Sequence, residues 1–484
     1  MGCEMAPDDR LHGDLPLTDA ATAAGEIAAE ATLLTSGFGS VGDPKAVPEA
    51  LAESGRDLSL TVVSGGSVGP AVDTALVEAD AVERRYPFQS RPAVNEAVND
   101  GRIAFNDRHI SSLGDEVAFG GLVDPDVAVV EALAVGEDWL VPSTSVGHTP
   151  AFVDAVDRLI VEVNRAQPRG LAAFHDVYRL ADPPDREGVP LSAPGERIGD
   201  PRVGFDPGAL VGVVETDRRD EPYSFRDPTA VDEAIAGNLR GFIEREVERS
   251  PLFEESLRMQ FGVGSLGNAL MGALADADVG DRDLVYFGEV IQDGLLDLLD
   301  DGGLRVASAT SLALSTAGQE RLFADPERYA EDVVLRPAEL SNRPELIDRF
   351  GVVAVNSAVE VDLYGHVNST HVGGSRMISG VGGSGDFVRN SPLSVIALPA
   401  TASGGDISTV RPMVTHVDHT EHDVDVIVTE HGVADLRGTS PRERAELLVE
   451  CAAPDFRADL EDYLDRAGEE GHTPHDLDSA FDWT

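Results

Sequence analysis

The sequence predicts an α/β protein with open, largely parallel sheets divided between two domains. Short apolar runs alternate along the chain with stretches of helical length, a pattern typical of parallel strands covered by helices. The chain has 484 residues, which is enough for two or three domains of ordinary size. Apolar residues make up 42% of it, as expected of a globular protein.

The first half alternates predicted helices with predicted strands and ends in a long loop. An alanine-rich amphipathic stretch, Thr18–Thr32, predicts the first helix. Strands are expected at Leu58–Val63, Ile103–Phe105, Val127–Ala132 and Leu210–Val214. Further helices are expected at Pro44–Ser54, Ala71–Ala79, Pro92–Asn99 and Thr149–Asn164. The stretch Asp182–Pro207, rich in Pro, Gly, Asp and Arg, predicts a surface loop.

The polar stretch Thr216–Thr229 predicts the domain boundary, with one domain over residues 17–220 and the other over 225–465. The second half then repeats the alternation. It begins with a predicted helix, Val231–Arg249, and ends with another, Pro441–Cys451. Strands are expected between them at Leu284–Phe287, Leu304–Ala307, Val352–Asn356, Val395–Pro399 and Val424–Val428.

The charge is extreme, with a formal net value of −50. Lys45 is the only lysine, and the other 36 basic residues are arginines. An acidic, lysine-poor surface suits a cytoplasm near salt saturation, where salt screens the repulsion between carboxylates. The alternative is an acidic chain meant for a basic partner. The spread of the acids along the whole length favours the first interpretation, because an interaction tail carries its charge in one block.

Composition also argues against several classes of protein. No stripe of basic residues is available to bind nucleic acid. The two cysteines, Cys3 and Cys451, are too few for a disulfide scaffold or a thiolate metal site. No apolar run reaches the length of a membrane span, and the N-terminus lacks the apolar core of a signal peptide. We therefore expect a soluble cytoplasmic protein with no membrane or nucleic-acid partner.

Glu289 is the first candidate for chemistry. The run from Tyr286 to Gly294 sets this acid after an expected strand, Asp283–Phe287, and before an expected helix, Val290–Leu299. Catalytic groups in open α/β sheets gather at the carboxyl ends of strands. A carboxylate there can act as a nucleophile, a general base or a ribose ligand.

The segment Gly262–Gly267 fits the pattern G-x-G-x-x-G and opens an apolar helix, Asn268–Leu274. Amides at such a helix start can bind pyrophosphate. Glu289 lies 22 residues past Gly267, near the place of the acid that grips a ribose in dinucleotide-binding folds. A dinucleotide site is therefore one alternative. Against it, the preceding residues, Phe253–Gln260, predict a helix where that fold needs a strand.

Two more glycine loops lie further along, at Ser379–Phe387 and Ser403–Asp406. Four glycines within six residues of the first let the backbone approach a ligand closely. Glu430 follows an apolar run as Glu289 does, so two strand-end acids predict an acid/base or nucleophile/orienter pair. Polar residues cluster in sequence around the Ser379–Phe387 loop: Asn342, Asn356, Asn368, Ser369, Thr370 and His371. The five histidines between 371 and 431 lack metal-ligand spacing, so no metal site is expected.

Several segments together resemble the acetyl-CoA hydrolase/transferase family, which includes the succinyl-CoA:acetate CoA-transferases. In the second half they are Gly288–Gly294, Glu339–Asn342, Asn356–His371, Gly380–Arg389 and Thr429–Gly438. In the first half they are Ser36–Phe38, Pro44–Pro48, Arg84–Gln89 and Thr144–Gly147. The resemblance extends from about residue 30 to residue 465. It implies two α/β domains of the CoA-transferase type, with the active site at their interface.

The resemblance also implies roles for individual residues. Glu289 resembles the nucleophile that becomes a glutamyl-CoA thioester, and Asn342 and Glu430 resemble residues that orient it or the incoming carboxylate or water. Gly383 resembles the loop amide that faces the reacting carbonyl. Contacts with CoA are implied at Gly262, Val263, Gly264, Ser265, Leu266, Val359, Ser379, Gly383 and Ser403. Family members often carry lysines near the third loop, where this chain has Ser403 and Asp406, and Arg411 is a candidate substitute.

The function expected from these observations is acyl-CoA:carboxylate CoA transfer, with acetate or a similar small acid as acceptor or product. Hydrolysis of acetyl-CoA at the same site, with water as acceptor, is the first alternative. A dinucleotide-dependent oxidoreductase, or a CoA-binding regulator without a covalent step, is the alternative from another class. We expect coenzyme A as a substrate, no permanently bound cofactor and no metal, and a homodimer.

Overall fold

The computed structural model describes residues 10–275 and 277–482, so Cys3 lies outside the described residues. Contacts divide the chain into two compact units. The first unit comprises the chain up to Tyr223 together with Gly288–Gln292 and Val306–Arg343. The second comprises Ser224–Phe287, Asp293–Arg305 and the chain from Pro344 onward. Both contain helices and open sheets, which confirms the predicted α/β class.

The first unit is built on a nine-stranded sheet in the order β4-β3-β2-β1-β5-β6-β8, with β7 paired to β5 and to β9. Its strands are β1 (Thr32–Thr35), β2 (Leu60–Val63), β3 (Val82–Tyr86), β4 (Ala104–Phe105), β5 (Val127–Val135), β6 (Trp139–Pro142), β7 (Leu159–Asn164), β8 (Val203–Gly204) and β9 (Leu210–Thr216). Strands β1, β2, β5, β7 and β9 run parallel. Every residue of β5 and β7 is buried, as expected of strands at the centre of a covered sheet.

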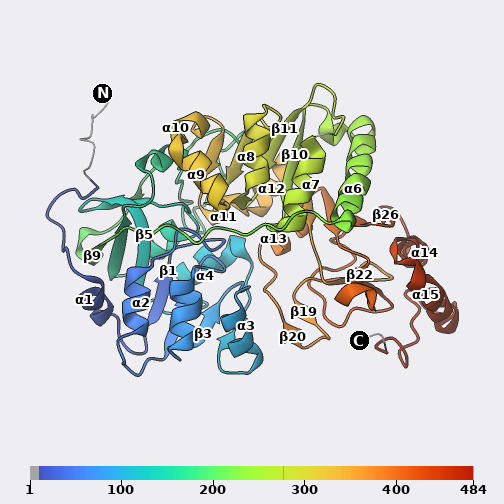
Figure 1. The fold of residues 1–484 in the computed structure, drawn as a ribbon, viewed down its shortest axis with the longest axis horizontal. Coiled ribbons are helices and arrows are strands. Elements are labelled where there is room, and N and C mark those ends of the chain that lie inside the picture. The colour runs from blue at the N-terminus through green and yellow to red at the C-terminus, as the bar shows by residue number, and fades with distance from the viewer. Residues whose placement is uncertain (1–9, 276, 483–484) are drawn as a thin grey trace. The chain divides into compact units, whose positions relative to one another are not determined.

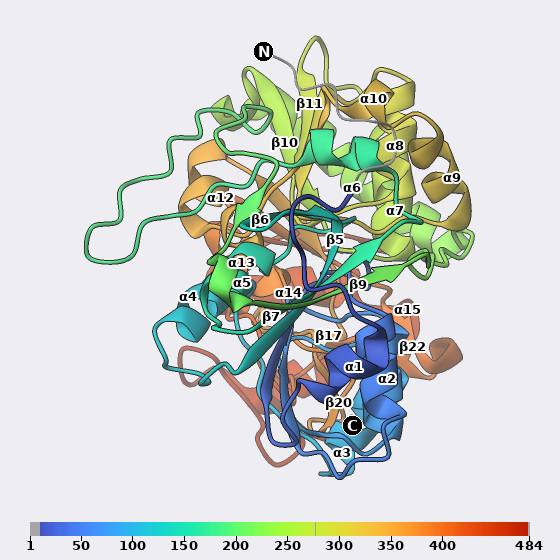
Figure 2. The ribbon, with the colours of Figure 1, turned by 90° about the vertical axis from the view of Figure 1, so that its left-hand side faces the viewer.

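Short helices pack against this sheet. They are α1 (Ala20–Gly25), α2 (Ala46–Ala52), the π-helical turn η1 (Ala71–Leu76), α3 (Pro92–Asn99) and α5 (Thr149–Asp154), and α4 (Leu113–Ala118) packs on α5. Figure 2 shows α1 and α2 side by side, and the two helices contact one another. Apolar residues of α1, α2, η1 and α3 form one buried cluster with those of β1, β2 and β5. Burial of this shared face is what holds the helices on the sheet.

The later segments of the first unit supply short elements. Strand β12 (Val290–Ile291) pairs in parallel with β14 (Ser311–Leu312), and β13 (Val306–Ala309) pairs in parallel with β15 (Val333–Leu335). Helices α9 (Thr316–Ala324), α10 (Pro326–Tyr329) and α11 (Ala338–Ser341) follow. Val290, Ala313 and Ala338 pack with Phe38 and Ile110 in a small apolar cluster, which joins these elements to the N-terminal part of the same unit.

The second unit contains a second open sheet, in which six strands follow the order β11-β10-β16-β21-β25-β26. They are β10 (Ser256–Phe261), β11 (Asp283–Phe287), β16 (Val353–Asn356), β21 (Leu393–Ala397), β25 (Val426–Thr429) and β26 (Gly432–Asp435). The helices are α6 (Ala230–Arg249), α7 (Ser265–Ala275), α8 (Asp293–Asp300), α12 (Pro344–Phe350), α13 (Ser384–Asn390), α14 (Pro441–Cys451) and α15 (Pro454–Ala467). Helix α7 contacts both α6 and β10, and Figure 1 shows these three elements close together.

Short strands complete the second unit. A three-stranded sheet has the order β18-β17-β24, from β17 (Glu360–Asp362), β18 (Val367–Asn368) and β24 (Val410–Arg411). Two hairpins pair β19 (His371–Val372) with β20 (Arg376–Met377), and β22 (Thr401–Ala402) with β23 (Ile407–Ser408).

Three predicted helices are wrong in whole or in part. The helix expected over Thr149–Asn164 ends at Asp154, and its second half is the buried strand β7. The helix expected over Phe253–Gln260 is mostly strand β10. The helix expected from Val290 begins only at Asp293, after the short strand β12. In each case, pairing with a strand distant in sequence outweighs local helix preference.

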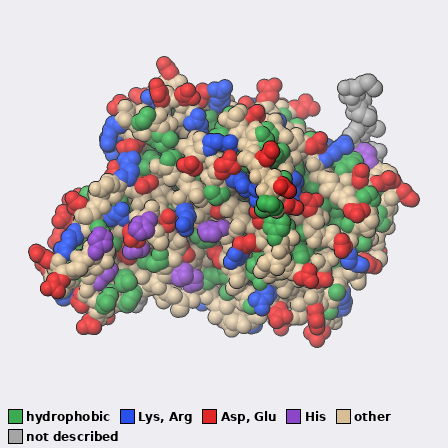
Figure 3. All heavy atoms as spheres, turned by 180° about the vertical axis from the view of Figure 1, so that it is seen from behind, with side chains coloured by type: hydrophobic (Ala, Val, Ile, Leu, Met, Phe, Trp, Pro, Cys, Tyr) green, Lys and Arg blue, Asp and Glu red, His purple; other side chains and the backbone are tan. Residues whose placement is uncertain are grey.

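The first predicted helix is also too long, because α1 ends at Gly25 and the chain enters β1 at Thr32. Strand β3 was not predicted, because its sequence Val-Glu-Arg-Arg-Tyr is mostly polar. Among the described residues, no helix is long and apolar enough to cross a membrane. Acidic side chains are scattered over the whole face shown in Figure 3, in keeping with the net charge.

Candidate active site

Glu289 lies in a bend between β11 and β12, at the end of a strand as predicted. Backbone hydrogen bonds fix both sides of this bend. Gly288 N donates to Ser308 O at 3.0 Å, and Glu289 O accepts from the amides of Thr310 and Ser311 at 2.8 and 3.1 Å. The residue is partly buried, and these bonds hold its backbone in place.

Asn342 follows α11 and is fully buried. Its Nδ2 donates to Glu289 Oε1 at 2.7 Å. A side-chain amide held in place orients a carboxylate and favours its ionised form, because the hydrogen bond is stronger to the anion. The structure therefore brings together two of the residues predicted for the site, both within the first unit.

The segment Ser143–Gly147 supports both residues, which the sequence analysis did not anticipate. Val146 N donates to Thr310 O at 2.9 Å, next to the amides that hold the Glu289 carbonyl. Leu312 N donates to Thr144 O at 3.1 Å. On the other side, Ala338 N donates to Gly147 O at 2.8 Å and so ties down the start of α11. One short segment thus fixes the backbones that carry Glu289 and Asn342.

Glu430 follows β25 in the second unit. Its Oε2 accepts from the backbone amide of Ala400 at 2.8 Å, and its Oε1 lies 3.8 Å from His431 Nε2. The strand end is held from a third side, because Asn238 Nδ2 on α6 donates to Thr429 O at 2.8 Å. Glu430 is therefore tied mainly to backbone, unlike Glu289.

The loop that starts at Gly262 follows β10 and leads into α7. Gln260 and Asn356, at the ends of β10 and β16, are buried and exchange hydrogen bonds of 3.2 and 3.0 Å. Gly262 N donates to Val355 O at 3.0 Å, so the loop begins from a fixed point. Gly264 has φ +131°, a conformation that favours glycine, and Val263 is 44% exposed.

The other residues expected to contact CoA also lie in the second unit. Gly383 immediately precedes α13 and is buried, and Ser379 and Val359 are partly buried. Ser403 is exposed in the turn between β22 and β23, with φ +52°. Arg411, the candidate substitute for the missing lysines, has an internal partner, because its Nε lies 2.6 Å from Glu360 Oε2.

Two of the histidines considered for a metal are stacked, with the ring centroids of His371 and His416 3.9 Å apart. Burial and the neighbouring His416 lower the pKa of His371. Thr370 Oγ1 lies 2.7 Å from His371 Nδ1 and donates to Asp418. Within the described part of the chain, no group of three or more His, Cys, Asp or Glu side chains is arranged to hold a metal ion.

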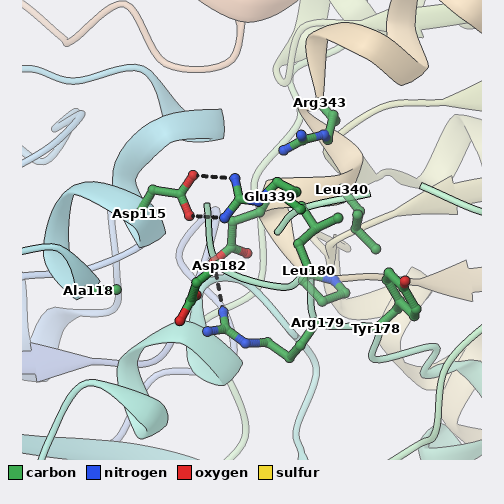
Figure 4. Close-up of a pocket in the computed structure, with 11 residues that line it drawn as sticks. Asp115, Ala118, Tyr178, Arg179, Leu180, Asp182, Glu339, Leu340 and Arg343 are labelled. Carbon is green, nitrogen blue, oxygen red and sulfur yellow. Dashed lines mark hydrogen bonds and ion pairs between the residues drawn. The ribbon is translucent and has the colours of Figure 1, made fainter. Parts of the chain in front are cut away.

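The first unit contains a small pocket (Figure 4). Two of the residues that line it, Glu339 and Arg343, are close to Asn342 in the sequence. Arg186 makes two hydrogen bonds to Asp115 there, of 2.7 and 2.9 Å, and they hold the pKa of Asp115 below its usual value. Arg179 Nη1 lies 3.8 Å from Glu339 Oε1. Acids and arginines balance one another in this pocket, so its charge favours neither anions nor cations.

A strand-end glutamate held by a side-chain amide, with glycine loops at other strand ends, has the groups that covalent catalysis by a carboxylate requires. Comparison with known proteins identifies the class. The N-terminal domain model of the acetyl-CoA hydrolase/transferase family matches residues 16–182, and its C-terminal domain model matches residues 318–464.

Curated relatives match over most of their length. The chain is 41% identical to the succinyl-CoA:acetate CoA-transferase of Clostridium kluyveri over 456 residues, 93% of this chain and 84% of that protein. It is also 41% identical to the acetyl-CoA hydrolase of Candida glabrata over 471 residues, 92% of this chain and 89% of that one. The chain belongs to the acetyl-CoA hydrolase/transferase family, and is thus an enzyme of that class.

A solved structure shows the same fold at lower identity. RipA from Yersinia pestis matches with a TM-score of 0.71 and 22% identity, covering 92% of this chain and 96% of that chain. The alternative of a dinucleotide-dependent oxidoreductase rested on the glycine pattern of residues 262–267. Membership of the acetyl-CoA hydrolase/transferase family replaces that interpretation.

Proposed function

We propose that this enzyme transfers CoA between acyl-CoA and a small carboxylate, through a glutamyl-CoA thioester on Glu289. The observation that carries the proposal is the 2.7 Å hydrogen bond from Asn342 Nδ2 to Glu289 Oε1. It holds an acid at a strand end in one orientation, as a carboxylate nucleophile requires. The 41% identity to a succinyl-CoA:acetate CoA-transferase supports the same chemistry.

The reaction proceeds through two anhydrides. The Glu289 carboxylate attacks the thioester carbonyl, and the C–S bond breaks to release CoA thiolate and leave a mixed anhydride. The thiolate then attacks the Glu289 carbonyl and expels the first carboxylate, which leaves glutamyl-CoA. A second carboxylate attacks this thioester and releases the thiolate again. Attack of the thiolate on the new acyl carbonyl gives the second acyl-CoA and restores Glu289.

Each addition places negative charge on a carbonyl oxygen. We propose that the backbone amides of Gly383 and of the loop Gly262–Leu266 donate hydrogen bonds to that oxygen. One such donor lowers the activation free energy by about 3–4 kcal/mol. Glu430 orients the acceptor. We assign further CoA contacts to Val359, Ser379 and Ser403.

Hydrolysis is the second candidate, because the chain is as similar to an acetyl-CoA hydrolase as to a transferase, at 41% identity. In that case water attacks glutamyl-CoA, the C–S bond breaks, and CoA thiol, the Glu289 carboxylate and a proton are released. We further propose that the enzyme works in a cytoplasm of high salt concentration, on the strength of its net charge of −50.

The covalent intermediate tests the mechanism directly. Incubation with acetyl-CoA followed by intact-mass measurement is expected to show a CoA-sized adduct, absent from Glu289→Ala. An adduct that persists in Glu289→Ala contradicts the assignment, as does its absence from the unmodified enzyme with every acyl-CoA of a panel. Parallel assays with and without added acetate or succinate separate transfer, which needs the acid, from hydrolysis, which does not.

A further inference from the structure

Lys45 is the only lysine of the chain, and it is 6% exposed. Its Nζ lies 2.5 Å from Glu131 Oε2 and 2.9 Å from Asp220 Oδ1, and it donates to Asp43 O at 2.7 Å. Glu131 and Asp220 are also buried. We call Lys45, Glu131 and Asp220 the Lys45 cluster.

The presence of a lysine at this position is informative, because every other basic residue of the chain is an arginine. An ammonium is a compact donor that can point three N–H bonds at oxygens in three directions, whereas a guanidinium presents a planar fork. Around Lys45 the three oxygens come from Asp43, Glu131 and Asp220. Burial lowers the pKa of Lys45, but the surrounding carboxylates raise it well above its ordinary value, so the ammonium keeps its charge.

The carboxylates of the cluster hold two hydroxyls of the segment Ser143–Gly147. Ser143 Oγ donates to Glu131 Oε1 at 2.5 Å, and Thr144 Oγ1 donates to Asp220 Oδ2. Without the ammonium, the two buried acids would keep their neutral hydrogen-bond donors but lose the positive charge between them, which is costly enough to force rearrangement. Lys45 thereby keeps both acceptors in place for the hydroxyls.

A second contact ties the same segment to the Lys45 cluster. Gly42 N donates to Asp220 Oδ1 at 3.2 Å, and Gly42 adopts φ +72°. A Cβ at this position would lie 2.7 Å from Ser145 Cβ and 2.8 Å from Ser145 N, so only glycine permits this approach. The turn at Gly42 thus packs directly on Ser145.

Backbone hydrogen bonds connect the segment Ser143–Gly147 to the residues next to Glu289 and Asn342. Its backbone bonds reach Thr310 and Leu312 beside Glu289, and Ala338 at the start of the helix before Asn342. All of these residues belong to the first unit.

We propose that Lys45 is a positioning residue for the reaction, setting the segment Ser143–Gly147 and thereby the alignment of Asn342 with Glu289. The inference rests on the proposed function of Glu289 as the nucleophile. Lys45 itself contacts neither Glu289 nor Asn342.

The test compares Lys45→Met with Arg85→Met. Arg85 is a matched control, because it is 1% exposed and pairs at 2.9 Å with a buried acid, Asp73, in the same unit. The hydrogen bonds of its side chain reach residues 62–86 and not the Ser143–Gly147 segment. For each folded variant, the rate of adduct formation from acetyl-CoA, kcat and KM are measured. Lys45→Met is expected to slow adduct formation and kcat about a hundredfold, with KM within about twofold, as for a misplacement of about 1 Å.

A second pair of variants, with smaller changes, tests the proposal if Lys45→Met fails to fold. Thr144→Val removes the hydroxyl that binds Asp220 while keeping the side-chain shape. Thr149→Val is its control, because the buried Thr149 Oγ1 has no hydrogen-bond partner among the described residues. Thr144→Val is expected to slow adduct formation about tenfold relative to Thr149→Val.

The outcomes separate the two proposals. If the unmodified enzyme forms the adduct and folded Lys45→Met forms it at the same rate, the positioning role is overturned while Glu289 stands. Equal slowing in Lys45→Met and Arg85→Met, or equal rates in the two threonine variants, overturns it as well. If the unmodified enzyme forms no adduct, the proposed function itself fails.

Discussion

Glu289 and Glu430 each follow an apolar strand, β11 and β25 respectively, but they are held in different ways. Glu289 accepts from a side-chain amide, that of Asn342, at 2.7 Å. Glu430 accepts from the backbone amide of Ala400 at 2.8 Å. The packing around Asn342 can orient its amide toward the carboxylate oxygen that reacts. The amide of Ala400 belongs to the backbone and instead holds the Glu430 carboxylate against the fold. This difference supports the proposed roles, a covalent one for Glu289 and a positioning one for Glu430.

The sharpest test of this difference is Glu289→Gln, which keeps an oxygen for Asn342 but removes the nucleophile. We expect kcat to fall at least about ten-thousandfold, since loss of a covalent nucleophile removes the whole pathway. Steady-state formation of succinyl-CoA from acetyl-CoA and succinate measures it. Turnover within about tenfold of the unmodified enzyme would abolish the distinction between the two acids.

Asn342→Asp tests the side-chain partner. It sets two carboxylates at hydrogen-bond distance, so one of them must hold a proton and the pKa of Glu289 rises. Because the nucleophile is the anion, the acid limb of the pH–rate profile should move to higher pH. We expect kcat at neutral pH to fall about a thousandfold, with partial recovery in alkaline buffer. Asn342→Ala is the control, since it loses the hydrogen bond without adding a second carboxylate and should shift the limb less, and a shared profile would contradict the argument.

Glu430→Gln tests the backbone-held acid. Its amide oxygen can still accept from Ala400 N, so the strand end should keep its shape while the negative charge is lost. We expect the adduct on Glu289 to form and overall turnover to fall by up to about a hundredfold. Intact-mass measurement together with steady-state kinetics separates the two steps. Failure to form any adduct would place Glu430 before the first step.

Varying the salt concentration tests whether the difference between Glu289 and Glu430 depends on short contacts or on the charge of the whole surface. At about 1 M salt the Debye length is about 3 Å, so surface carboxylates stop repelling one another while short buried contacts are screened much less. The thermal midpoint should therefore rise with KCl into the molar range, whereas the ratio of unmodified to Glu430→Gln turnover should stay constant. Melting curves and rates across a KCl series measure both. A flat or falling midpoint would instead favour a basic partner for the acidic surface.

The residue pattern predicted the alternation of helices and strands and the strand-end position of Glu289, because both depend on short apolar runs. It missed strand β10, because Arg258 and Gln260 interrupt its apolar pattern and the partner that buries Gln260 is Asn356, 96 residues away. It also misassigned β7, whose acid Glu162 is buried because it accepts from the amides at the start of α2.

The candidate site shows the same limit. Strand ends and the family resemblance predicted roles for Glu289, Asn342 and Glu430. The residue pattern of Ser143–Gly147 does not indicate that its backbone hydrogen bonds support the first two. The same holds for Lys45, whose partners Glu131 and Asp220 are 86 and 175 positions away along the chain. Contacts over such separations are set by the sheet order rather than by neighbouring residues.

Because the single lysine is buried, its reaction with an amine-directed reagent can be used to measure unfolding of the first unit. An amine-directed reagent meets one side-chain target, and in the folded enzyme that target is 6% exposed. Each molecule in which the Lys45 cluster opens gains one label of known mass on this side chain, while closed molecules stay unlabelled there. Mass spectrometry of a labelling time course would thus count openings of the first unit molecule by molecule, without an engineered probe.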